Sequence, residues 1–189
     1  RLRELAGELA RDREAARGYT PEMTLPLSVF QKLPKADLHV HLDGSLRVST
    51  VLELAEQQGV ELPATSPEGL RRAMHCGENT GSLVEYLKAF DITLSVMQTE
   101  DALYRSAYEL AEDAAAENVR YMEVRYSPLL HQDKGLSLEQ VVDAVLEGLR
   151  EAESKYPIKT GVIICAIRSF DRSKSLRLAE LAVQYKRKG

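Results

Sequence analysis

The stretch Leu33–Arg47, LPKADLHVHLDGSLR, decides how the rest of the chain is interpreted. Its centre, residues 36–42, has the alternation that predicts a β-strand, in which every second side chain shares a face. The apolar face carries Ala36, Leu38, Val40 and Leu42. The opposite face carries Asp37, His39, His41 and, just past the strand, Asp43. We expect the apolar face to pack against helices and the polar face to need partners, because unpaired burial of such groups is costly.

The two histidines of this polar face favour a metal site. His39 and His41 lie two apart on the strand, so their rings point the same way from backbone positions roughly 6–7 Å apart. Both rings can then reach one divalent ion at about 2.0–2.1 Å. Gly44 and Ser45 predict a turn into a helix, and βα barrels carry their active sites at the C-terminal ends of the strands. A pair of structural histidines is the alternative, but this position in a βα pattern favours the metal.

Strand and helix patterns alternate along the remaining sequence. Strands are predicted at 36–42, 119–126 and 160–167. Helices are predicted at 48–58, from 66 onwards, and at 83–96, 100–118, 137–155 and 173–186. This alternation predicts an α/β chain with a parallel sheet. Because a complete barrel takes ~250 residues, we predict the N-terminal part, about three βα units plus inserted helices, of a (β/α)8 TIM-type barrel that continues past Gly189.

The sequence divides into two predicted regions. Residues 1–34 are expected to form an N-terminal helical arm, up to about residue 18, and an extended connector that contains Pro21, Pro26 and Pro34. Residues 35–189 are expected to form the N-terminal portion of the barrel domain.

Composition and charge exclude several classes of protein. The 25 basic and 29 acidic side chains are interspersed and give a net charge of -4, without the basic face of a nucleic-acid-binding protein. The longest apolar run, Val162–Ile167, is too short for a membrane span. Cys76 and Cys165 lack paired spacing and indicate reduced thiols of a cytoplasmic protein. We therefore expect no nucleic-acid partner and no membrane partner.

Three motifs resemble the adenosine deaminase family, a branch of the metal-dependent amidohydrolases built on (β/α) barrels. LPKADLHVHLDGSLR is similar to its opening signature, YMEVRYSP at Tyr121–Pro128 is a second match, and LVEYLKAFD at Leu83–Asp91 is a weaker third. The resemblance implies zinc-dependent hydrolytic deamination of adenosine and 2′-deoxyadenosine to the inosine products and ammonia. It also implies one zinc ion per complete barrel and a purine nucleoside as the substrate.

The resemblance assigns roles to individual residues. His39 and His41 match two zinc ligands, and Asp43 matches a carboxylate that accepts a hydrogen bond from a ribose hydroxyl. The implied substrate-binding residues are His41, Asp43, Leu83, Tyr86, Leu87 and Phe90. The last four match an apolar helix over the purine, although their spacing fits ordinary core packing equally well. Tyr86 stands where we expect a phenylalanine.

Members of this family carry further zinc ligands and the proton donor on later strands. No catalytic residue is therefore expected within this chain, and the 189-residue chain alone is expected to be inactive. The rest of the barrel is expected on the same or a second chain. Glu123 and Arg125 are interpreted as a structural ion pair inside the barrel, and His75 and His131 are expected at the surface.

Two other functions compete with this interpretation. Adenine or other purine-type aminohydrolases tend to carry HLEGT where this chain has HLDGS, and they tend to lack RYSP, so Asp43, Ser45 and Ser127–Pro128 favour the nucleoside enzyme. An AMP deaminase is disfavoured because no basic phosphate-binding cluster is visible. A non-catalytic half-barrel binding module is the alternative outside the enzymes.

Overall fold

The computed structural model describes residues 26–74 and 83–186, with side chains for 26–74 and 89–186. The chain divides into two compact units, Arg1–Leu33 and Pro34–Gly189. In the first unit the described element is helix α2 (Leu27–Lys32), so the prediction of a wholly extended connector is wrong. Pro26 directly precedes the first helical residue, where a fixed φ is compatible with a helix start, and Leu33 is extended before Pro34. The predicted helix at 1–18 lies outside the described residues.

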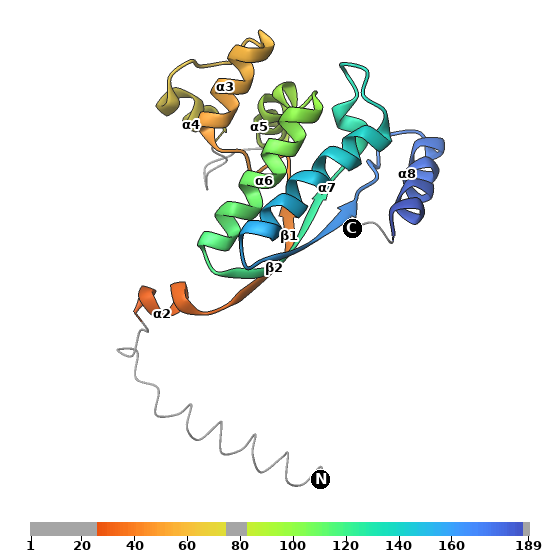
Figure 1. Cartoon of the computed structure of the whole chain (residues 1–189). Coiled ribbons are helices and arrows are strands. Elements are labelled where there is room, and N and C mark those ends of the chain that lie inside the picture. The colour runs from red at the N-terminus through yellow and green to blue at the C-terminus, as the bar shows by residue number, and fades with distance from the viewer. Residues whose placement is uncertain (1–25, 75–82, 187–189) are drawn as a thin grey trace, which may run out of the picture. The chain divides into compact units, whose positions relative to one another are not determined.

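The second unit is built on a parallel sheet in the order β1-β2-β3 (Figure 1). The strands are β1 (Lys35–His41), β2 (Val119–Tyr126) and β3 (Lys159–Ile164). His41 pairs with Arg125 and Tyr126 pairs with Ile164, so the C-terminal ends of all three strands meet at one edge. β3 ends before the predicted residue 167 because its partner β2 also ends, with Cys165 N donating a last bond to Tyr126 O.

The helices of this unit begin and end largely where the sequence predicts. They are α3 (Val48–Gln58), α4 (Pro67–Met74), α5 (Leu83–Val96), α6 (Glu100–Ala116), α7 (Leu138–Lys155) and α8 (Arg172–Tyr185). Ser137 and Gln140 cap α7 reciprocally, and Gly59 ends α3 with φ 65°, a left-handed conformation that glycine adopts without strain. A short 3-10 helix, η1 (Pro128–His131), follows β2 and was not predicted.

One face of the sheet is covered by helices. Helices α6 and α7 lie side by side (Figure 1), and Met122, Val124 and Tyr126 of β2 belong to the same buried core as residues of these helices. Helix α8 packs through Leu178 and Leu181 in a second cluster with α7. Removal of this apolar surface from water, at roughly 25 cal/mol per Å², is the main stabilising contribution to such a layer.

The first strand is covered only near its C-terminal end. Leu42 is fully buried and Val40 packs against the core, but Leu38 is 58% exposed and Ala36 is exposed. The prediction that the whole apolar face packs against helices is therefore wrong for the first half of the strand, because β1 is an edge strand and no described element covers that half. Within the described ranges, no helix is long and apolar enough to cross a membrane.

Candidate functional site

The two histidines lie together at the C-terminal end of β1, as the sequence predicts. Their ring centroids are 5.5 Å apart and the ring planes meet at 43°. An ion about 2.0–2.1 Å from a ring nitrogen lies about 3 Å from the centre of that ring, so one ion can reach both rings at this separation. The separation of the His39 and His41 rings is therefore compatible with one shared zinc ion. Among the described residues, no group of three or more histidine, cysteine or acidic side chains could hold a metal.

Arg125 contacts His39 from the neighbouring strand. Its Nη1 atom lies 3.1 Å from Nδ1 and 3.0 Å from Nε2 of His39, and its Nη2 donates to the Sγ of Cys165 over 3.5 Å. The odd-numbered face of β2 is therefore the face of the candidate site. The predicted ion pair is wrong, because Glu123 accepts a hydrogen bond from the Tyr121 hydroxyl at 3.0 Å and no ion pair of the described residues joins it to Arg125. Arg125 instead lies against His39, because side chains on adjacent strands approach each other closely.

The turn after β1 is fixed by hydrogen bonds from three directions. Leu42 N donates to Arg125 O at 3.0 Å, which prolongs the ladder between the strands. The Ser45 hydroxyl donates to His41 O at 2.5 Å, and the buried Thr93 hydroxyl of α5 donates to Asp43 O at 2.6 Å. The turn therefore presents the Asp43 side chain in a defined position.

Arg47 anchors the start of the helix that follows this turn. Its guanidinium donates to Asp113 at 2.9 and 2.5 Å and to Glu112 at 2.7 Å, and both acceptors belong to α6. A cation at a helix N-terminus is unfavourable to the helix dipole, and these carboxylates offset that cost. The beginning of α3 is thereby held against α6, four residues after Asp43.

The Asp43 carboxylate is buried and incompletely paired. The residue is 7% exposed, and its Oδ1 atom has no hydrogen-bond partner. The same atom lies 3.5 Å from Nδ1 of His41, and burial raises the pKa of the Asp43 carboxyl. Because a buried acceptor without a donor is costly, this oxygen is suited to accept a hydrogen bond from a bound ligand.

Helix α5 reaches the site through Phe90. The Phe90 ring stands edge-on to His41 with centroids 6.1 Å apart. A Cβ atom at Gly44 would lie 3.2 Å from the same ring, so the close approach of helix and turn favours glycine there. Phe90 is thus brought to His41 as an apolar wall. The side chains of the other predicted purine-covering residues, Leu83, Tyr86 and Leu87, lie outside the described residues.

His131 is buried, which contradicts the prediction of a surface histidine. It is fully inaccessible, its Nδ1 lies 3.0 Å from Met97 O, and its ring packs edge-on to Tyr126 at 5.9 Å. Burial lowers the pKa of His131 to about 4. The cause is η1, which brings His131 against Met97 just past the end of α5, and no pattern in the sequence predicts that short helix. His75 lies outside the described residues.

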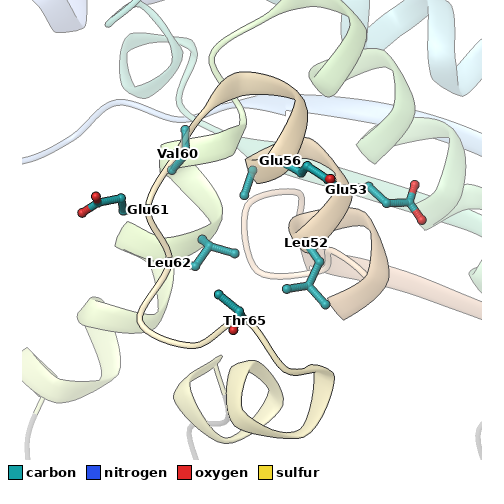
Figure 2. A pocket seen from close by; sticks show the side chains of 8 residues that line it. Leu52, Glu53, Glu56, Val60, Glu61, Leu62 and Thr65 are labelled. Carbon is teal, nitrogen blue, oxygen red and sulfur yellow. The ribbon is translucent and has the colours of Figure 1, made fainter.

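A cavity of about 590 Å³ lies between the second half of α3 and the segment leading to α4 (Figure 2). Its lining residues are Leu52, Glu53, Ala55, Glu56, Val60, Glu61, Leu62 and Thr65. None of them is a histidine, and none belongs to the turn at Asp43. The chemistry of the candidate site is therefore not located in this cavity.

Comparison with known proteins covers most of the chain. The family model for adenosine deaminase matches residues 34–189. The chain is 47% identical over 165 residues to a probable adenosine deaminase of Dictyostelium discoideum, covering 87% of this chain and 21% of the relative. It is 44% identical over 160 residues to an adenosine deaminase of Clostridium botulinum (strain Loch Maree / Type A3), and the match covers 85% of this chain and 48% of the relative. The chain spans about half the length of the Clostridium relatives and about a fifth of the Dictyostelium protein.

Solved structures share the fold. An adenine deaminase from Arthrobacter aurescens is 28% identical with a TM-score of 0.71, covering 81% of this chain and 46% of that chain. The Arabidopsis protein ADAL, complexed with GMP, is 29% identical with a TM-score of 0.70, and the match covers 84% of this chain and 48% of that chain. A cog1816 amidohydrolase from Burkhoderia ambifaria, with bound Zn, is 24% identical with a TM-score of 0.72. This match covers 87% of this chain and 45% of that chain, and at this identity it shows the fold alone. With the parallel sheet, these matches to about half of each structure confirm the predicted fold class.

Proposed function

The chain belongs to the adenosine deaminase family, and we propose that it supplies two zinc ligands and part of the nucleoside pocket for the hydrolytic deamination of adenosine and 2′-deoxyadenosine. The observation that carries this proposal is the juxtaposition at the end of β1. Two histidine rings 5.5 Å apart lie beside a buried carboxylate oxygen that has no hydrogen-bond partner. The two proposed zinc ligands therefore lie next to the carboxylate that we propose recognises the sugar.

The proposed reaction replaces the amino group at C6 of the purine with the oxygen of water and releases ammonia. His39 and His41 would hold a zinc ion, which supplies Lewis-acid chemistry and lowers the pKa of water toward 7. Asp43 would accept a hydrogen bond from the 5′-hydroxyl of the sugar, and Phe90 would exclude water beside His41. We propose that the remaining metal ligands and the proton donor come from other strands of the barrel, on the same or a second chain, so that residues 1–189 alone are inactive.

The choice of a nucleoside over a free base rests on Asp43. A free base has no sugar hydroxyl to satisfy the buried Oδ1 atom, and a buried polar group left unpaired rejects the ligand that lacks its partner. The relatives at 44% and 47% identity are an adenosine deaminase and a probable adenosine deaminase, whereas the adenine deaminase structure is 28% identical. The cytosol is the proposed compartment, on the reduced state that the spacing of the two cysteines indicates.

Kinetics of the complete protein with three substrates test this proposal. We expect adenosine to be deaminated efficiently, 5′-deoxyadenosine to lose roughly tenfold or more in kcat/KM because Asp43 has no donor, and adenine to be the poorest substrate. Asp43→Asn is expected to reduce the difference in kcat/KM between adenosine and 5′-deoxyadenosine. Adenine turning over as fast as adenosine would contradict the nucleoside assignment and support the adenine deaminase alternative.

A further inference from the structure

Ser127 lies at the edge of the sheet where the candidate site is formed. It directly follows β2, with extended backbone angles of φ -106° and ψ 113°. The alternation of β2 places it on the face of Glu123 and Arg125, which is the face that contacts His39. The ladder between the two strands ends with the pairing of His41 with Arg125 and the bond from Leu42 N to Arg125 O, so Asp43 and Ser127 follow the C-terminal ends of two adjacent strands at the same edge of the sheet.

The hydroxyl of Ser127 has no role within the described part of the fold. Ser127 occupies the N-cap position of η1, yet its side chain makes no capping hydrogen bond. The residue is 2% exposed, and its Oγ atom is buried without a partner. A buried hydroxyl without a hydrogen bond destabilises the ligand-free protein. A bound ligand that forms this hydrogen bond would remove the cost.

Unpartnered polar atoms concentrate at this place. Among the described residues, the buried side-chain atoms without a hydrogen bond are Asp43 Oδ1, Arg125 Nε, Tyr126 Oη, Ser127 Oγ and His131 Nε2. Three of these residues, Asp43, Arg125 and Ser127, belong to the site face, whereas Tyr126 is on the opposite, helix-covered face of β2. A polar group of a bound ligand could form hydrogen bonds with these atoms.

We propose that Ser127 is a second specificity-determining contact to the sugar hydroxyl that Asp43 recognises. This inference rests on the proposed function. A hydroxyl group both donates and accepts: the sugar O–H donates to Asp43 Oδ1, and the Ser127 O–H donates to the sugar oxygen. Asp43 and Ser127 together therefore recognise both the donor and the acceptor of one sugar hydroxyl. A ligand with a hydrogen atom in place of that hydroxyl leaves both protein atoms without a hydrogen bond.

Binding of inosine and 5′-deoxyinosine to the complete protein, measured by calorimetry, separates this role from others, because neither ligand is deaminated. Ser127→Ala is expected to weaken inosine about tenfold, the effect of one lost hydrogen bond, and to leave 5′-deoxyinosine unchanged. The ligand-free variant is expected to unfold at the same temperature as wild type or higher, because an unsatisfied hydroxyl is removed. Ser106→Ala is the control: Ser106 is equally buried but bonded to Ala102 O within α6, and its loss should not change the inosine preference.

Ser127→Cys provides a second variant that preserves volume and donates only weakly, so it should show the same selective loss if the alanine variant does not fold. Equal weakening of both ligands together with a lowered unfolding temperature would overturn the inference and assign Ser127 a structural role, as would an unchanged inosine preference. These outcomes leave the proposed function intact when wild type still deaminates adenosine. A wild-type protein that deaminates adenine and binds no inosine would overturn both.

Discussion

At the scale of single residues, the buried polar groups of this chain fall into two sets with different consequences. The Thr93 hydroxyl donates to Asp43 O in the turn after β1, and the Gln98 amide donates to Leu130 O in η1, so these two side chains hold neighbouring segments in place. Asp43 and Ser127 keep an atom unpaired at the strand ends. The first set explains why the turn at Asp43 is well defined, and the second belongs to the site at which we propose that a ligand binds.

His131 gives the fold a dependence on pH. Its pKa is about 4 in the folded protein against an ordinary value of 6.5, because burial disfavours the charged ring more strongly than the Met97 carbonyl and the charge of Asp133 favour it. Between these values the unfolded chain binds the additional proton, so stability falls as pH decreases from about 6.5 toward 4. The expected contribution is about 2 kcal/mol between pH 7 and pH 5.

The measurement is the free energy of unfolding in urea at pH 7 and pH 5, for wild type and His131→Gln. The variant lacks the titrating ring, so its stability should decrease less over this interval. Equal decreases in the two proteins would show that His131 is not buried as a neutral ring.

At the scale of elements, the boundaries that the sequence predicts best are those with local chemical causes. The Ser137–Gln140 capping box and the glycine at 59 mark helix ends because a single side chain or its absence satisfies the terminal backbone groups. The elements that the sequence did not predict, α2 and η1, are short helices of six and four residues, too short for an apolar period to show. The end of β3 depends on where its partner strand ends, which is a tertiary property.

The contact between α6 and α7 depends on a missing side chain. A Cβ atom at Gly148 would lie 2.2 Å from Tyr104 O and 3.2 Å from the Ala107 side chain. Helix propensity alone would make Gly148→Ala stabilising by about 1 kcal/mol. We expect the backbone clash to outweigh this gain and to destabilise the protein by about 2 kcal/mol, within the range for overpacked cores.

Urea unfolding of Gly148→Ala checks this expectation. Glu147→Ala, at the neighbouring exposed position of the same helix, is the control and should change stability by less than about 0.5 kcal/mol. An alanine at 148 that stabilises the protein would mean that the two helices are farther apart than described.

At the scale of the whole molecule, the motif at 33–47 predicts that His39 and His41 lie together, but it does not predict the contacts around them. Strand alternation alone places His39 beside His41, and the register then brings the second strand's polar face to them. The contact of Arg125 with His39 and the burial of His131 could not be predicted, because each depends on residues more than thirty positions away. The exposure of Leu38 likewise depends on which elements pack beside β1.

The central claim is that His39 and His41 bind one zinc ion together, and the zinc content of the purified complete protein tests it most directly. Elemental analysis should find about one zinc ion per barrel in wild type and in the control His131→Gln, because the buried His131 ring packs against Tyr126 and contacts Met97 O. His39→Ala and His41→Ala should each lose most of the zinc and nearly all adenosine turnover, because a zinc site stripped of one protein ligand binds the ion far more weakly. Full zinc occupancy in both alanine variants would contradict the assignment of these two histidines as ligands.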